Sequence, residues 1–492
     1  MENLNDFLLN YLQTKYNASE TVIDHAKKVL EQLEKGSVCF KIENETVIEE
    51  LKKSSAVGTK NEIRPLILDG INLYIQRYYI YQTGIINNID KMVKDGRFHI
   101  ITGGPGTGKT TSLAKILAEK LNENIEQNIL LAAPTGKAAY RMNEALRFSL
   151  KYDEKKEHTH WVKNTDQKVL EILNKLESKT LHRLLGYIHL SVNFKHTSEN
   201  PLNANIIVID ECSMVDLPMM SKLLDAVPDN CNLFLLGDKN QLASVEVGSV
   251  FADICEKYKR DGRIYKELTE NHRAKDAPGI VKLSNQILKA KEDKSDINFD
   301  DEIICKNIEY RKEDKYDTLI KNFEGLFNAR NKEETLNMLK KFQILCTTKT
   351  GINGTEQINK RIKELAKKVR FTPIIITENN YELKLFNGDV GVKDEKEAHF
   401  IIGEEIKSFS ALTLPAHELA YAITIHKSQG SEYDCIAVVY PNDIKQDDSK
   451  TFLTGELLYT AITRAKKKCL IFGSKDIIVN SCKNTISRAS GI

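Results

Sequence analysis

A glycine-rich loop between an expected strand and an expected helix limits the fold of this chain more than any other feature. Residues 98–102 form an apolar run, residues 103–110 fit the pattern G-x-x-x-x-G-K-[ST], and residues 112–120 have helical spacing. Backbone N–H groups of such a loop, together with the N terminus of the helix, converge on phosphate oxygens. We therefore predict a phosphate-binding loop composed of Gly103, Gly104, Pro105, Gly106, Thr107, Gly108, Lys109, Thr110 and Thr111.

Polar residues downstream supply the other groups that nucleotide hydrolysis requires. Lys109 is expected to reach the β and γ phosphates, and the Thr110 hydroxyl to hold Mg²⁺. The apolar run 206–209 ends in two carboxylates, so Asp210 is expected to bind Mg²⁺ through its water shell and Glu211 to polarise the attacking water. Gln241 follows a further apolar run and is a candidate sensor of the γ-phosphate.

Alternating apolar runs and helical patterns predict two α/β units. The run 128–133 and the helix that follows it extend the first unit into a parallel sheet covered by helices. The second half contains expected strands but no phosphate loop, at residues 342–346, 421–425, 435–440 and 469–472. We expect a nucleotide in the cleft between the two units, with the second unit supplying arginines. The candidates are Arg273 and Arg464.

Composition limits the class of protein. A chain of 492 residues should form about three or four domains, and no apolar run reaches the roughly 18 residues of a membrane span. The nine cysteines are scattered and never form C-x-x-C, which favours reduced thiols in the cytoplasm over a disulfide framework or a zinc cluster. Because the net charge is only +2, a nucleic-acid partner would be held in a local groove.

The region before the phosphate loop shows no chemistry of its own. Its charged, helix-patterned segments predict a small helical interaction domain over residues 1–80, including an aromatic-rich amphipathic helix at 72–82. The first α/β domain should span residues 81–280 and carry a small β-hairpin at about 187–202, and the second should span residues 281–492.

Eight stretches in order resemble the motifs of superfamily 1 helicases, most closely those of the RecD family, the alpha subunits of exodeoxyribonuclease V. A further stretch at 386–391 resembles the opening of a small RecD β-barrel, expected here at about 385–418. Each motif alone is modest support, but all eight occur in the family's order. They are residues 103–110 (motif I), 133–139 (Ia), 180–186 (Ib), 210–216 (II), 237–242 (III), 270–273 (IV), 426–432 (V) and 459–465 (VI).

The resemblance implies an ATP-dependent 5′→3′ DNA helicase with two RecA-like domains and with ATP and Mg²⁺ as cofactors. By motif, Gln241, Arg273 and Arg464 would sense or stabilise the γ-phosphate, and Gly430 and Glu432 would lie near the sugar and phosphates. The hairpin would correspond to a pin at the duplex junction. Single-stranded DNA would be contacted without sequence readout by Pro134, Thr135, Lys137, Thr180, His182, Thr424, His426 and Lys427.

Departures from the family pattern bear on partners. Position 272 is His where the family commonly has Tyr, and the short N-terminal region has no helix-hairpin-helix repeats of the stand-alone RecD-like helicases. This favours a subunit that docks on a RecC-like partner beside a RecB-like helicase-nuclease in double-strand break repair and recombination. A stand-alone helicase, a nucleotide-gated DNA-binding scaffold and, last, a P-loop kinase remain as alternatives.

Overall fold

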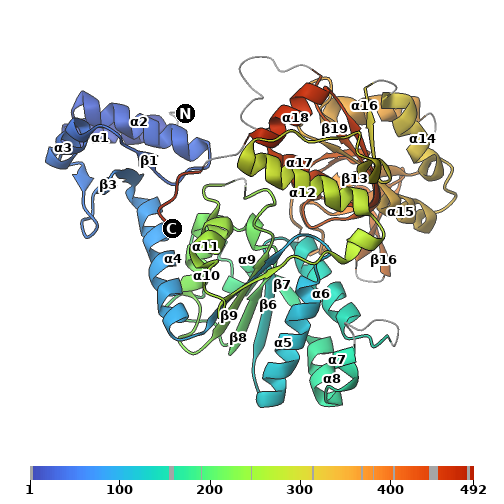
Figure 1. Ribbon diagram of the computed structural model, residues 1–492, viewed down its shortest axis with the longest axis horizontal. Helices are drawn as coiled ribbons and strands as arrows, with labels where there is room; N and C mark the ends of the chain where they lie inside the picture. The colour runs from blue at the N-terminus through green and yellow to red at the C-terminus, as the bar shows by residue number, and fades with distance from the viewer. Residues whose placement is uncertain are drawn as a thin grey trace.

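The computed structural model describes residues 4–153, 160–189, 191–244, 246–312, 315–366, 369–380, 382–402, 405–442, 453–484 and 488–492. Two helix-covered parallel sheets lie next to each other, and a smaller N-terminal unit is joined to the first by the long helix α4 (Gln76–Lys94; Figure 1). No helix in these ranges is both long and apolar enough to cross a membrane.

The first parallel sheet has the strand order β10-β5-β9-β8-β6-β7. Its four central strands are buried on both faces, because successive residues such as Ile100 and Ile101 enter different apolar clusters, whereas its edge strands are partly exposed. The strands are β5 (Phe98–Gly103), β6 (Ile129–Ala133), β7 (Ser178–Thr180), β8 (Ile206–Ile209), β9 (Asn232–Gly237) and β10 (Tyr265–Leu268). The helices are α5 (Lys109–Glu123), α6 (Gly136–Ser149), α7 (His160–Lys163), α8 (Gln167–Lys175), α9 (Leu181–Leu185), α10 (Leu217–Asp225) and α11 (Val250–Tyr258), with the 3-10 turns η2 (Cys212–Met214) and η3 (His272–Lys275).

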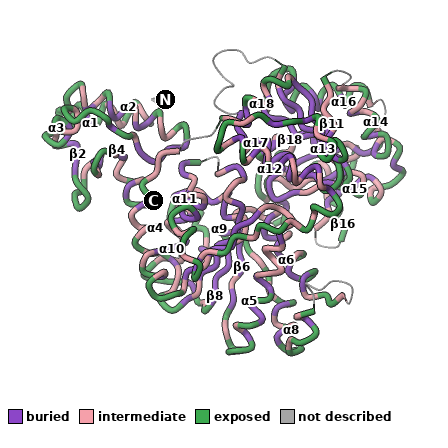
Figure 2. Tube along the Cα trace, viewed as in Figure 1, coloured by how far each residue is buried: buried purple, intermediate pink, exposed green. Residues whose placement is uncertain are grey.

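The second parallel sheet has the order β11-β20-β19-β12-β18. It contains strands at all four predicted places and one edge strand that was not predicted, β11 (Ile308–Arg311). The others are β12 (Phe342–Cys346), β18 (Ala422–Thr424), β19 (Tyr433–Val439) and β20 (Ala465–Phe472). The helices are α12 (Pro278–Asp293), α13 (Glu302–Cys305), α14 (Lys315–Phe327), α15 (Lys332–Lys341), α16 (Thr355–Leu365), α17 (Gly455–Ile462) and α18 (Lys475–Lys483), with η4 (His426–Ser428). Figure 2 shows burial concentrated in the strands of both parallel sheets.

A five-stranded antiparallel sheet of order β16-β15-β14-β13-β17 is inserted in the second half. Its strands are β13 (Thr372–Ile376), β14 (Val390–Lys393), β15 (Glu397–Ile402), β16 (Glu405–Ser410) and β17 (His417–Leu419). It therefore begins before residue 385, where the β-barrel was expected. In the described part of the chain its end strands β16 and β17 do not pair with each other; residues 403 and 404 lie outside that part.

The N-terminal region is not purely helical, contrary to the sequence-based expectation. Besides α1 (Leu4–Tyr16), α2 (Glu20–Glu34) and α3 (Glu45–Lys53), it contains β1 (Phe40–Lys41), β2 (Val57–Gly58), β3 (Leu66–Asp69) and β4 (Asn72–Ile75) in one sheet. The helix expected at 72–82 begins only at Gln76, because residues 66–69 and 72–75 pair as an antiparallel hairpin. Gly70 permits the tight turn between them with its φ of +61°.

Residues 187–202 were expected to form a β-hairpin. The pairing described there consists of two isolated antiparallel bridges, Tyr187 with Phe194 and Thr197 with Asn200, and residue 190 lies outside the described residues.

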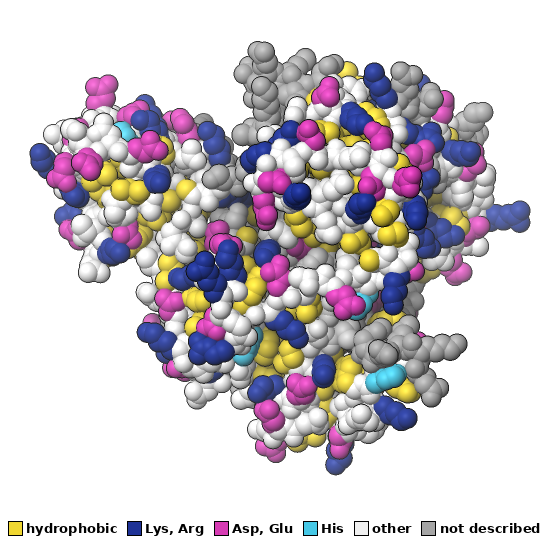
Figure 3. Space-filling view, in the orientation of Figure 1, with side chains coloured by type: hydrophobic (Ala, Val, Ile, Leu, Met, Phe, Trp, Pro, Cys, Tyr) yellow, Lys and Arg dark blue, Asp and Glu magenta, His cyan; other side chains and the backbone are white. Residues whose placement is uncertain are grey.

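The C-terminal segment 488–492 returns to the N-terminal unit and lies beside α4 (Figure 1). The Gly491 N–H donates to Gln82 on α4 at 2.8 Å, and the Val38 N–H donates to the Ala489 carbonyl at 2.7 Å. On the face in view in Figure 3, basic and acidic side chains are interspersed, in keeping with the small net charge of the chain.

Candidate nucleotide site and adjoining groove

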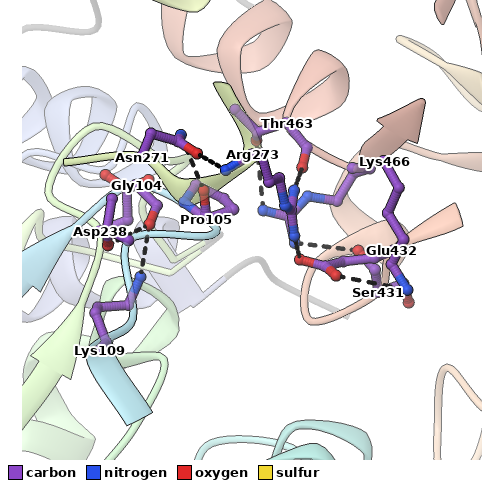
Figure 4. A network of polar contacts seen from close by, with 12 residues as sticks. Gly104, Pro105, Lys109, Asp238, Asn271, Arg273, Ser431, Glu432, Thr463 and Lys466 are labelled. Carbon is purple, nitrogen blue, oxygen red and sulfur yellow. Dashed lines mark hydrogen bonds and ion pairs between the residues drawn. The ribbon is translucent and has the colours of Figure 1, made fainter. Parts of the chain in front are cut away.

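The phosphate loop connects β5 to α5 at the carboxyl edge of the first sheet. Gly106 and Gly108 have φ values of +82° and +80°, a conformation that side-chain-bearing residues rarely adopt. The Lys109 ammonium lies across the loop and donates to the carbonyls of Gly103 at 2.6 Å and Gly104 at 3.3 Å (Figure 4). It thus occupies the mouth of the loop, where a phosphate would compete for it.

The two carboxylates after β8 lie opposite this loop. Burial, together with the neighbouring Glu211, raises the pKa of Asp210 to about 6, although Lys109 acts in the opposite direction. Glu211 has a left-handed backbone with φ of 52°, which is uncommon for a residue other than glycine. The turn therefore holds the Glu211 backbone in a conformation that a residue with a side chain seldom adopts.

The end of β9 adds Asp238 and Gln241 to the same region. Asp238 is buried and accepts hydrogen bonds from the Tyr459 hydroxyl at 3.0 Å and from Gln241 Nε2 at 3.2 Å. Burial raises the pKa of Asp238. Within the described residues, Gln241 Oε1 is buried without a hydrogen-bond partner, so an acceptor is left open next to the loop.

The two candidate arginines come from different sheets, which corrects the expectation that the second unit supplies both. Arg273 lies in η3, directly after edge strand β10 of the first sheet, and η3 is tied to the phosphate loop by the bond from His272 N–H to the Gly106 carbonyl at 3.1 Å. Sequence spacing could not reveal this, because β10 is an edge strand far along the chain from β5, with which it pairs. Only Arg464, between α17 and β20, belongs to the second sheet.

Both arginine side chains already have partners. Arg273 forms an ion pair with Glu432 and donates to the Thr463 carbonyl at 3.2 Å (Figure 4). Arg464, which is 2% exposed, donates to the carbonyls of Thr460 at 3.1 Å and Ser431 at 3.3 Å. Burial alone would raise the pKa of Glu432, but the nearby arginines, Arg273 first, hold it below its usual value.

One cavity of about 830 Å³ joins most of these groups. It is lined by the loop from Pro105 to Thr111, and also by Asp210, Glu211, Gln241, Gly430, Glu432 and Arg464. Gly103, Gly104 and Arg273 are not among its lining residues, although Gly103 and Gly104 accept from Lys109 and Arg273 contacts Glu432. Arg141 on α6, which sequence reasoning missed, also lines it.

A second cavity, of about 340 Å³, contains most of the residues predicted to bind DNA. Pro134, Thr135, Lys137, Thr180 and His182 line it from the first sheet, and His426 and Lys427 from the second. We call this cavity the groove. Thr424 is not part of its lining; its hydroxyl accepts from the Lys427 N–H at 3.3 Å.

Asn379 and residues 386–388, ahead of β14, close one side of the groove. The Phe386 ring lies over Gly136, where an added Cβ would come within 2.7 Å of it. Lys137 Nζ donates to the Gly388 carbonyl at 3.3 Å. Burial, followed by the charge of Arg141, lowers the pKa of Lys137 to about 7, with Asp389 acting in the opposite direction.

Hydrogen bonds at Leu242, the neighbour of Gln241 in the nucleotide cavity, join the two sheets and reach the groove. The Leu242 N–H donates to Thr460 Oγ1 at 2.9 Å, and Gln429 Nε2, which lines the groove, donates to the Leu242 carbonyl at 3.0 Å. The segment 238–242 therefore borders the nucleotide cavity through Gln241 and contacts the groove through the bond between Leu242 and Gln429.

Comparisons with known proteins agree with this arrangement. A family model described as an AAA domain matches residues 87–247, and one described as a UvrD-like helicase C-terminal domain matches residues 419–472. The RecBCD enzyme subunit RecD of Mycolicibacterium smegmatis is 34% identical over 420 residues, covering 80% of this chain and 71% of that protein. The RecBCD enzyme subunit RecD of Haemophilus influenzae is 31% identical over 463 residues, covering 80% of this chain and 69% of that protein.

More distant matches lie outside that group. The ATP-dependent RecD2 DNA helicase of Deinococcus radiodurans is 25% identical over 395 residues, covering 77% of this chain and 47% of that protein. Among solved structures, a Pif1 helicase matches with a TM-score of 0.43 and 19% identity, covering 80% of this chain and 93% of that chain. That structure describes DNA unwinding at forked double-stranded DNA by two coordinating Pif1 helicases.

Proposed function

The chain belongs to the RecD family of ATP-dependent DNA helicases, and we propose that it moves 5′→3′ on single-stranded DNA as a motor subunit of a RecBCD-like helicase-nuclease complex. The observation that carries this proposal is the pair of cavities, one with the phosphate loop and one with the groove residues, bridged through residues 238–242. Polarity rests on the family alone.

ATP fits the first cavity by its chemistry. The loop presents backbone N–H groups and Lys109 to an anion, and Gln241 offers an unpaired acceptor beside it. We propose that Lys109 binds the phosphates, that Glu211 accepts a proton from the attacking water, and that Gln241 orients that water. Arg273 and Arg464 would stabilise the charge that develops on the terminal phosphate.

Magnesium fits the same place. In the described part of the chain, no three His, Cys, Asp or Glu side chains form a group that could hold a metal ion. This agrees with the usual binding of Mg²⁺ by one or two carboxylates together with substrate phosphates. Thr110 and Asp210 would hold the ion, which would neutralise phosphate charge during hydrolysis.

Coupling to DNA follows from the bridge between the cavities. If ATP draws Arg464 towards its terminal phosphate, the second sheet must shift relative to the first, where Arg273 lies. Gln429 belongs to the second sheet and would shift with it, against the Leu242 carbonyl that it contacts beside the groove. Hydrolysis removes the charge that holds the arginines, so the sheets can separate again. Alternating grip on DNA by the two sides of the groove would give directional steps.

We propose roles for the finer parts of the fold as well. The antiparallel sheet β13–β17 would cover the DNA, and residues 187–202 would act as a pin at the junction. The N-terminal unit would dock on a RecC-like subunit, because it exposes the large apolar side chains Phe7, Ile63 and Ile71. Nine free cysteines agree with a reducing cytoplasm.

The test is ATP hydrolysis by the purified chain with and without single-stranded DNA. We expect strong stimulation by DNA in the wild type and none in Glu211→Gln, which should still bind ATP. A chain that binds ATP and DNA but hydrolyses slowly under both conditions would favour the scaffold alternative. Stimulation without capture of RecB-like and RecC-like subunits in a pull-down would favour the stand-alone helicase.

A further inference from the structure

Arg141 is a half-buried cation at the nucleotide cavity. It lies on α6 and lines the cavity together with Lys109, Glu211 and Arg464. Burial lowers the pKa of Arg141, while the negative charges of Glu432 and Glu211 act in the opposite direction. Because the pKa of an arginine lies above 12 in water, its guanidinium still carries a full positive charge at neutral pH.

The three other cations that are proposed to act on the phosphates already have partners within the chain. Lys109 is held by loop carbonyls, Arg464 by two carbonyls of the second sheet, and Arg273 by Glu432. In the described residues, by contrast, the Arg141 guanidinium forms neither a hydrogen bond nor an ion pair. Its side chain therefore lines the cavity without an acceptor from the described residues.

A half-buried guanidinium that has no acceptor within the chain is available to an acceptor that binds in the cavity from outside. Its planar fork matches the oxygens of a phosphate in bidentate geometry. The charged groups that act on it electrostatically include Glu211, Glu432 and Arg464, all of which belong to the end of the cavity where hydrolysis is proposed to occur.

We propose that Arg141 is a third arginine of the nucleotide site and donates hydrogen bonds to the terminal phosphate of bound ATP. This inference rests on the proposed ATP site and deepens it. It assigns to α6 a contact with substrate, in addition to the DNA contacts proposed for Thr135 and Lys137 at the start of the same helix.

The experiment compares equilibrium binding of ADP and of a non-hydrolysable ATP analogue, together with DNA-stimulated hydrolysis. The variants are Arg141→Ala, Arg141→Lys and, as a matched control, Arg263→Ala, whose side chain is 80% exposed and paired with Asp261. We expect Arg141→Ala to lose about tenfold or more in affinity for the analogue but less than about threefold for ADP, with a lower kcat. Arg141→Lys should recover part of the loss, and the control should match the wild type.

Each other outcome has a definite meaning. Equal loss of ADP and analogue would overturn the inference, because the contact would then be with the base, the sugar or the inner phosphates, or the helix would be displaced. Wild-type affinity and kcat in Arg141→Ala would also overturn it while leaving the proposed function intact. If the wild type bound neither nucleotide, the proposed function itself would fail.

Discussion

Single-stranded DNA should bind less tightly as the pH rises above neutrality, because of Lys137. Its pKa is lowered to about 7 in the DNA-free protein, by burial first and by Arg141 second. A DNA phosphate in place of the Gly388 carbonyl would favour the charged ammonium and raise that pKa. Binding therefore takes up a proton at pH values above 7, and affinity falls as the pH rises.

The size of the effect follows from the free-protein pKa. With a pKa of about 7, the charged fraction of Lys137 falls several-fold between pH 7.5 and 8.5, and the dissociation constant should rise by nearly the same factor, about 1 kcal/mol. The assay is fluorescence anisotropy of a labelled oligothymidine at constant ionic strength. Constant salt is essential because phosphate contacts are salt-dependent.

Two substitutions separate this cause from others. Lys137→Arg keeps the charge at every pH tested, so the pH dependence should flatten and binding at pH 8.5 should tighten. Lys427→Arg is the matched control: Lys427 lines the same groove but is paired with Glu418 at 3.0 Å, and this variant should retain the wild-type pH dependence. Equal slopes in the wild type and Lys137→Arg would refute the reasoning.

Three further substitutions test the contacts between elements. Glu432→Gln should release Arg273 and tighten binding of an ATP analogue about tenfold, near 1.4 kcal/mol, by equilibrium titration; weaker binding would mean that Glu432 contacts the nucleotide directly. Tyr459→Phe removes the hydroxyl that donates to buried Asp238. The activation free energy of DNA-stimulated hydrolysis should rise by about 1–3 kcal/mol, measured as a lower kcat. An unchanged kcat would contradict a role of this contact between the two sheets in hydrolysis. Arg488→Ala should lower the free energy of unfolding in urea by about 1–3 kcal/mol, because the Arg488 guanidinium donates to the carbonyls of residues 244, 246 and 248. An unchanged urea midpoint would show that the contacts of the C-terminal segment 488–492 contribute little to stability.

Local patterns in the sequence predicted the centre of the fold well. The apolar runs before the phosphate loop, before Asp210 and before Asp238 are continuous, and each is followed by polar or glycine residues that form a turn. Continuous apolar runs are typical of strands that are buried on both faces of a parallel sheet. The same reasoning located four strands of the second sheet. It missed β11, an edge strand whose residues 309–311 are only partly buried and which lacks a continuous apolar run.

Other errors arose where tertiary pairing decides the structure. The short strands β3 and β4 are stabilised by each other, so a helical reading of residues 72–75 was locally reasonable but wrong. The side of the cleft that carries Arg273 depends on β10 pairing with β5, which no local pattern encodes. Arg141 was missed because the motif predicts its helix but not which side chains of that helix meet the cavity.

The most direct test of the central claim is ATP-driven unwinding of short duplexes with a single-stranded tail at either the 5′ or the 3′ end, by the chain alone and with its partner subunits. We expect the wild type to unwind the 5′-tailed duplex with ATP and to leave the 3′-tailed duplex intact. Glu211→Gln should bind both duplexes without unwinding either. Unwinding of the 3′-tailed duplex alone would contradict the proposed direction. Failure to unwind either duplex, with or without partners and despite binding ATP and DNA, would contradict the claim that the two cavities form a motor.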